Sequence, residues 1–142
     1  MLAKAYAGPI FVTAAYFAVW YYLLLVYQRG TKYRLKARYQ DAGQEFDRYF
    51  GQDPEMLAVD RAVGNTLEQM VPFLAALWMF AIFVSPQQAG WYGGVYVGLR
   101  AIYPSLLGRR ISKLQSKRVA FVTVPAYLII FAMIGRSVAA SI

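Results

Sequence analysis

The sequence contains no cysteine and no histidine. Without cysteine the chain offers no disulfide, no thiolate metal ligand and no catalytic thiol of its own. Without histidine it lacks the commonest general base and the commonest metal ligand. Any chemistry must therefore use Arg, Lys, Tyr, Asn, Ser, Asp or Glu, or a reactive group that a bound substrate brings.

Charged residues are also scarce. They make up 15% of the 142 residues, whereas hydrophobic residues make up 59%, and a soluble domain has about 25% charged residues. A short water-soluble domain has a large surface relative to its volume, so its interior could not bury so many apolar side chains. Lipid must solvate part of it. We expect an all-α integral membrane protein that forms a single domain over residues 1–142.

Four segments are candidates for helices that cross the membrane, each close to the ~20 residues that a span needs. They cover residues 5–27, 62–84, 89–108 and 119–140. The second is less obvious, because its purely apolar part, residues 71–84, is short and the extension back to residue 62 includes Asn65 and Glu68. In the third, Pro104 removes a helical hydrogen bond and should kink the helix, and the Gly94–Gly98 spacing would permit close helix contact. The sequence thus predicts a four-helix membrane bundle.

Positive charge is concentrated in two connections. Of the 15 Lys and Arg residues, seven lie within 28–61 and five within 109–118. A net charge of +8 would suggest nucleic acid in a soluble chain, but in a membrane protein the positive-inside rule is the first explanation. It places both connections in the cytoplasm and both termini on the other side. Topology and anionic lipid headgroups explain most of these residues, and we expect no nucleic-acid partner.

Polar residues inside the predicted spans form two stripes. Arg61, Asn65 and Glu68 are four and three positions apart, which places them on one helix face, and Arg100 and Tyr103 share a face of the next span. Charges inside a membrane indicate a functional site by default, although Glu68 and Arg100 could also simply neutralise one another between packed helices.

The run from Arg61 to Phe73 has Arg, Asn, Glu and then Pro-Phe at fixed intervals. It resembles the signature of the MAPEG family, the membrane-associated proteins in eicosanoid and glutathione metabolism. In the third span, Arg100 followed three residues later by Tyr103 is similar to a second family segment. The resemblance extends over nearly the whole chain, because the spans and the long basic first loop also agree with it.

The resemblance implies a homotrimer that holds glutathione between neighbouring subunits near the cytoplasmic face. Glu68 would then take the amino group of glutathione, while Arg61 and Asn65 would contact its peptide and carboxylate groups. Two further sets of side chains would contribute. Arg100 and Tyr103 would line the same site, and Arg34 in the first loop would meet a carboxylate.

For catalysis the resemblance implies an Arg that stabilises the glutathione thiolate, and Arg118 is the best candidate, with Lys117 or Lys113 as substitutes. Many active members have a Tyr where this sequence has Leu107. The leading hypothesis is a glutathione-dependent transferase or peroxidase that acts on a hydrophobic electrophile or lipid hydroperoxide. The alternative is a non-catalytic MAPEG-like protein, either lipid-binding or a structural subunit of a larger membrane complex.

Overall fold

The computed structural model describes the backbone of residues 2–108 and 113–142, and the side chains of residues 4–108 and 117–142. All regular structure in these ranges is helical. The elements are α1 (Leu2–Ala5), α2 (Ala7–Tyr21), the π-helical η1 (Tyr22–Gln28), α3 (Arg29–Asp41), α4 (Pro54–Phe83), α5 (Pro86–Leu107) and α6 (Lys113–Ala139).

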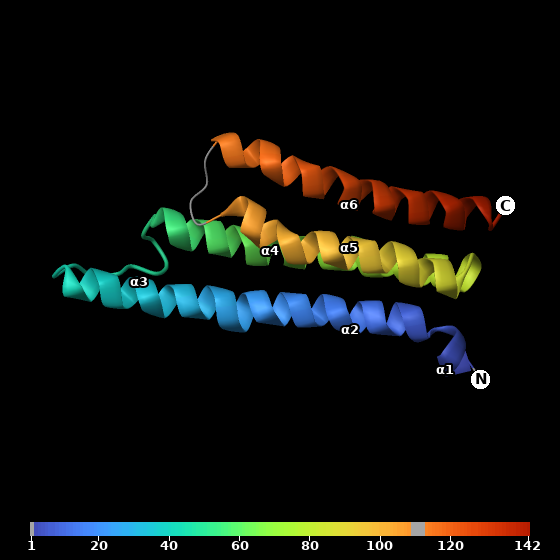
Figure 1. Cartoon of the computed structure of the whole chain (residues 1–142), viewed down its shortest axis with the longest axis horizontal. Helices are drawn as coiled ribbons and strands as arrows, with labels where there is room; N and C mark the ends of the chain where they lie inside the picture. Colours follow the sequence, from blue (N-terminus) through green and yellow to red (C-terminus); the bar gives the residue numbers. More distant parts are fainter. Residues whose placement is uncertain (1, 109–112) are drawn as a thin grey trace.

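The long helices lie side by side (Figure 1) and form four rods, namely α2–η1–α3, α4, α5 and α6. The first rod is continuous, because α2, η1 and α3 follow one another without a break. Both chain termini lie at one end of the bundle, and the α3–α4 connection and the C-terminal end of α5 lie at the other (Figure 1). The first segment predicted to be cytoplasmic and the end of α5 that precedes the second therefore lie at the same end. Residues 109–112 of the second segment lie outside the described residues.

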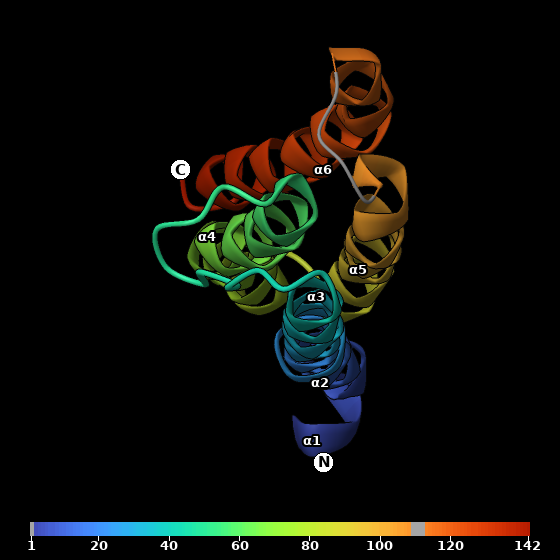
Figure 2. The same ribbon diagram turned by 90° about the vertical axis from the view of Figure 1, so that its left-hand side faces the viewer.

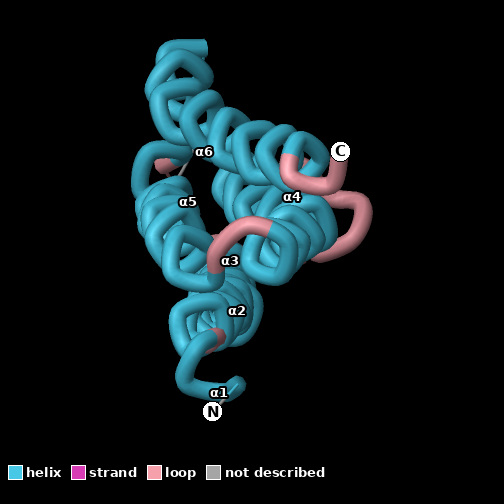
Figure 3. The backbone as a smooth tube through the Cα atoms, turned by 90° about the vertical axis from the view of Figure 1, so that its right-hand side faces the viewer, coloured by secondary structure: helices cyan, strands magenta, loops and turns pink. Residues whose placement is uncertain are grey.

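Helices α4 and α5 are the central packing elements, since each contacts the other, α2 and α6. The end-on views show α4 and α5 between the first rod and α6 (Figures 2 and 3). Three helical stretches are long and apolar enough to cross a membrane, namely residues 7–41, 54–83 and 117–139. The 22 residues of α5 fail that test because they include two glutamines, several glycines and Arg100. The helix nevertheless lies alongside the other long helices (Figure 1).

The polar segment 28–61 is more helical than hydropathy suggested. Helix α3 continues the first rod as far as Asp41, and α4 begins at Pro54, eight residues before the predicted second span. Local signals explain the start of α4. Asp53 accepts hydrogen bonds from the backbone amides of Glu55 and Met56, and Pro54 occupies the first helical turn, where its missing N–H costs nothing.

Three fully buried aromatic rings join α2, α4 and α5 in the middle of the bundle. Phe73 and Tyr96 stack with ring centroids 3.9 Å apart, and Tyr16 lies 5.1 Å from Phe73 and 6.1 Å from Tyr96. The Tyr16 hydroxyl donates a hydrogen bond to the backbone carbonyl of Thr66. This cluster fixes the rotation of α4 and α5 relative to one another, and with it the direction of their polar residues.

The closest helix contacts use glycines other than the predicted pair. A Cβ atom on Gly93 would lie 2.6 Å from Val12 Cγ1 and 2.8 Å from Leu77 Cδ1, whereas one on Gly94 or Gly98 would meet nothing within 4 Å. The expectation that Gly94 and Gly98 allow close packing is thus not met within the chain. Gly93 has that role, because it faces α2 and α4 while its neighbour Gly94 faces outward.

Candidate functional site

Asn65 of α4 and Arg100 of α5 form the centre of the predicted site. Arg100 Nη2 donates a hydrogen bond to Asn65 Oδ1 at 2.9 Å and a longer one to the Asn65 backbone carbonyl at 3.4 Å. The two polar stripes predicted from the sequence therefore meet at this pair. A guanidinium group presents five N–H donors, so this contact leaves most of its hydrogen-bonding capacity for other groups.

The Arg100 side chain is only 1% exposed, yet it meets no carboxylate among the described residues. Its Nε donates to the Tyr96 hydroxyl at 3.4 Å, and its charge lies 5.3 Å from the centre of the Tyr103 ring. Nη1 has no hydrogen-bond partner in the described part of the chain. A buried cation with an unpaired donor is costly unless a counter-charge compensates it, so the geometry favours an anionic ligand here.

Arg61 and Glu68 lie on the same helix as Asn65, but both side chains are exposed. Neither forms an ion pair with any described residue. The alternative in which Glu68 neutralises Arg100 is therefore wrong within a single chain, because Asn65 occupies that position. Both side chains are left at the surface of the single chain.

Tyr103 is buried and packs with Ala62, Leu107 and Val122. Its role in lining a glutathione site stays a prediction. Leu107, which replaces the second Tyr found in many relatives, is 5% exposed. The position is thus part of an apolar cluster. A hydroxyl that would lie there in those relatives is absent from this chain.

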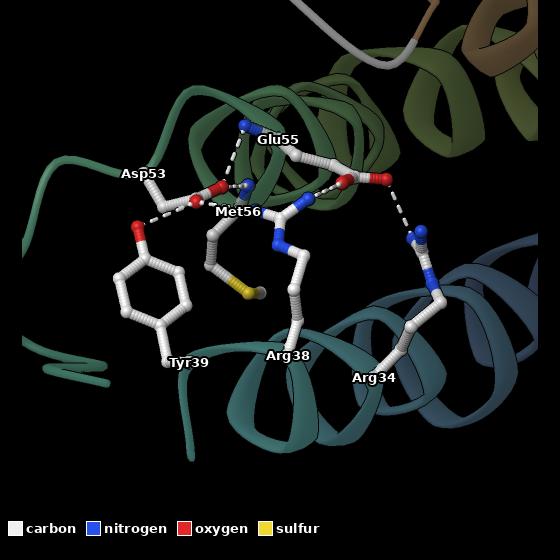
Figure 4. Close-up of polar contacts among 6 residues, drawn as sticks. All are labelled: Arg34, Arg38, Tyr39, Asp53, Glu55 and Met56. Atoms are coloured by element: carbon white, nitrogen blue, oxygen red, sulfur yellow. Dashed lines mark hydrogen bonds and ion pairs between the residues drawn. The ribbon is translucent and has the colours of Figure 1, made fainter. Parts of the chain in front are cut away.

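Arg34 is placed elsewhere, in an ionic clasp between α3 and the start of α4 (Figure 4). Its Nη2 contacts Glu55 Oε1 at 2.6 Å, and Arg38 contacts Asp53 at 3.1 Å and Glu55 at 3.5 Å. The Tyr39 hydroxyl also donates to Asp53 at 2.9 Å. The role of Arg34 toward glutathione stays a prediction, because its ion pair is with Glu55.

The clasp changes the acidity of Asp53. Burial alone would raise the pKa of its carboxyl, but hydrogen bonds from the Met56 amide, the Tyr39 hydroxyl and the Glu55 amide, together with the charge of Arg38, outweigh burial and lower the pKa below the ordinary value. Asp53 therefore stays ionised at neutral pH, where it caps α4 and holds Arg38.

Arg118, the predicted thiolate-stabilising residue, is exposed on α6, and so is its neighbour Lys117. The side chain of Lys113 lies outside the described residues. Within one chain, none of the described contacts joins Arg118 to the Arg100–Asn65 pair. Its catalytic role stays a prediction that depends on what a second subunit places beside it.

Sequence reasoning missed Tyr96 and the acidic residues of the clasp. Tyr96 precedes Arg100 by one helical turn, so the i, i+4 spacing was available as a signal for the contact. Asp53 followed by Pro54 and Glu55 is a sequence pattern for the beginning of a helix. It was hidden because hydropathy places the boundary of the span further along the chain.

The fold and the site together define an integral membrane protein, a helical bundle with a buried guanidinium and an outward-facing carboxylate on neighbouring helices. Within that class, the family model described as "MAPEG family" matches residues 8–139, and the chain belongs to this family of membrane-associated proteins in eicosanoid and glutathione metabolism. No curated protein matches the chain significantly.

Proposed function

We propose that this protein binds glutathione at the Arg100–Asn65 pair and activates its thiol for attack on a hydrophobic electrophile or lipid hydroperoxide. The observation that carries the proposal is the buried Arg100, with Nη1 unpaired among the described residues. Family membership supports the choice of glutathione as the ligand.

The available side chains fit the groups of glutathione, which has two carboxylates, one ammonium and one thiol. Arg100 can hold a carboxylate through its unpaired Nη1, and the exposed Arg61 can hold the other through paired N–H donors. Glu68 is an ionisable acceptor for the ammonium group, and nothing in the described chain competes for it. Tyr103 supplies an aromatic face beside Arg100, 5.3 Å from its charge.

Glutathione brings the reactive sulfur, which explains how a chain with no Cys and no His could act on electrophiles. A free thiol has a pKa of about 8.5, so most of it is protonated at neutral pH. A guanidinium beside the sulfur favours the thiolate, which is the nucleophile. Arg118 is the candidate for that task, and the thiol proton leaves to solvent.

We further propose a homotrimer with four spans per chain and both termini on the non-cytoplasmic side. The exposed Arg61 and Glu68 support the assembly, because a carboxylate facing lipid is unfavourable and a neighbouring subunit would cover it. Four of the six exposed large apolar residues of α4 share the Arg61–Glu68 face, namely Leu57, Val71, Met79 and Ile82. They repeat with it at close to seven-residue intervals, as helix–helix contacts require.

The activity is tested with purified oligomer, glutathione and a generic aryl halide, by following the conjugate spectroscopically. We expect glutathione-dependent turnover that Arg118→Ala reduces by roughly two orders of magnitude, the order found when one electrostatic stabilising group is removed. Lys36→Ala removes an exposed charge from α3 and should leave turnover unchanged. Full activity in Arg118→Ala would remove this residue from the mechanism, and an inactive wild type would reject the transferase.

A second candidate is a MAPEG-like protein without catalysis, either lipid-binding or a structural subunit of a membrane complex. Leu107 favours this candidate, because it places an apolar side chain where many active family members have a Tyr. Binding of glutathione without conjugation of any electrophile would be consistent with this candidate. Absence of glutathione binding would make it the preferred account.

A further inference from the structure

A polar pocket of about 290 Å³ opens beside the end of the first span, at the end of the bundle that carries the α3–α4 connection. It is lined by Gln28, Arg29, Lys32, Tyr33, Arg48 and Tyr49. Three of these six residues are cationic and none is acidic. The pocket is separate from the Arg100–Asn65 pair, and none of its lining residues belongs to the predicted glutathione site.

The cations are held close together. The charged groups of Arg29 and Lys32 each lie 5.7 Å from the centre of the Tyr33 ring, and neither forms an ion pair with a described residue. Arg48 is fixed by two hydrogen bonds of 2.9 Å to Asp60, which also accepts one from Gln28 at 2.8 Å. Asp60 offsets one charge, so a net positive charge of about two remains, which an anion would stabilise.

The depth of the pocket matches the headgroup layer of a bilayer. Arg29 and Lys32 follow Tyr27, the last residue of the predicted first span, by two and five positions, or about 3 and 8 Å along a helix. The headgroup layer on each side of the hydrocarbon core is about 5–8 Å thick. The bonds between Arg48 and Asp60 and between Gln28 and Asp60 bring the α3–α4 loop back to this level.

The tip of that loop presents two aromatic residues. Tyr49 and Phe50 are 84% and 89% exposed, and their backbone amides both donate to Asp47 Oδ1 at 2.9 Å. A Cβ atom on Gly51 would collide with the Asp47 carbonyl, so the turn is specified by its own sequence. Exposed aromatic rings at headgroup depth are typical anchors at the membrane interface.

From these observations we propose that the pocket binds the phosphate of an anionic phospholipid of the surrounding bilayer. Arg29, Lys32 and Arg48 contact the phosphate, Tyr49 and Phe50 insert beside the acyl chains, and Tyr33 holds the two unpaired cations together. The site is independent of the proposed transferase activity, since it shares no residue with it.

The test is native mass spectrometry of the purified protein in neutral detergent, titrated with phosphatidylglycerol or with phosphatidylcholine of the same acyl chains. We expect retained phosphatidylglycerol and little phosphatidylcholine. Lys32→Gln and Arg29→Gln should each weaken phosphatidylglycerol binding about fivefold, the effect of one cation near a charged headgroup. Lys32→Arg should keep it, because the charge is retained.

Lys36→Gln is the matched control, because Lys36 lies one helical turn from Lys32, is exposed, and does not line the pocket. It should change binding less than twofold. An equal loss in Lys36→Gln and Lys32→Gln would show diffuse attraction and overturn the proposal. So would equal retention of phosphatidylcholine, or displacement of phosphatidylglycerol by inorganic phosphate at equal concentration, which would indicate a soluble anion as the ligand.

Discussion

Arg100 is the residue on which the account depends. Its charge is 1% exposed and is surrounded by an amide oxygen, a hydroxyl and two aromatic faces, with no carboxylate among the described residues. Structural ion pairs inside proteins use a carboxylate partner to balance the charge. The local arrangement instead leaves the Nη1 donors of Arg100 without a partner among the described residues, which is the basis for proposing an anion supplied from outside the chain.

Substitution of Asn65 separates the structural role of this contact from its binding role. Asn65→Ala removes the 2.9 Å acceptor of Arg100 and should lower the free energy of unfolding by about 2 kcal/mol, as for other hydrogen bonds to charged groups. Asn65→Asp keeps an acceptor and neutralises Arg100. Its thermal unfolding midpoint should equal or exceed that of the wild type, while glutathione binding falls roughly tenfold or more. Unchanged glutathione binding in Asn65→Asp would contradict the role of Arg100.

Residue identities at the site were predictable, but their pairings were not. The spacing of Arg61, Asn65 and Glu68 places them on one face of a helix, and the sequence predicts that Arg100 approaches it. The sequence does not say which of the three meets Arg100. That depends on the rotation of α4 and α5, which the stacked Phe73 and Tyr96 rings set through tertiary packing.

At the scale of elements, the beginning of α4 is stabilised by the clasp with α3. Asp53 carries two amide hydrogen bonds and the contacts to Arg38 and Tyr39. Asp53→Ala should therefore cost about 1 kcal/mol or more of stability through the lost helix cap alone. The matched change Asp41→Ala, in an exposed residue of α3, should be nearly neutral. Thermal unfolding in detergent measures both.

The lowered pKa of Asp53 gives the clasp a defined pH dependence. A carboxyl whose pKa is lower in the folded than in the unfolded state stabilises the fold above its ordinary value, here 3.8. That contribution is lost as the pH falls from 3.8 through the folded pKa. Wild-type stability should thus drop below about pH 4 more steeply than that of Asp53→Ala. If the stability of the wild type and of Asp53→Ala fell in parallel below pH 4, Asp53 would not be the group responsible.

Gly93 and Gly94 test the packing of α5 with a pair of adjacent substitutions. Gly93→Ala places a methyl group 2.6 Å from Val12 Cγ1 and should destabilise by about 1–3 kcal/mol through overpacking. Gly94→Ala meets open space within the chain and should be neutral or stabilise by up to about 1 kcal/mol through helix propensity. Equal effects on thermal unfolding would contradict the placement of α5.

Three of the four helical rods qualify as membrane spans by length and hydropathy, whereas α5 does not. The helical parts of segment 28–61 were less accessible. Helix α3 carries little apolar surface, and its position depends on Arg34 and Arg38 meeting Glu55 and Asp53 across 15 to 21 residues. Such long-range ion pairs leave no periodic signal in the sequence.

At the scale of the whole molecule, one face of α4 lacks a partner within the chain. It carries the exposed Arg61 and Glu68 together with Ala75 and large apolar residues. Ala75→Trp should block close approach of a second subunit and shift the protein from trimer to monomer in detergent, as measured by light scattering. Ala132→Trp, on an exposed face of α6, is the matched control. A trimer that survives Ala75→Trp would place the interface elsewhere.

The most direct measurement is glutathione binding to the purified oligomer by isothermal titration calorimetry. The account predicts saturable binding at or below millimolar glutathione. Glu68→Gln should weaken it roughly tenfold or more, because a charge-assisted hydrogen bond to the ammonium group is lost. Glu45→Gln removes the same charge from the exposed loop and should bind as the wild type does. If the wild-type protein shows no saturable heat at millimolar glutathione, the buried Arg100 is not a glutathione site and the central claim is wrong.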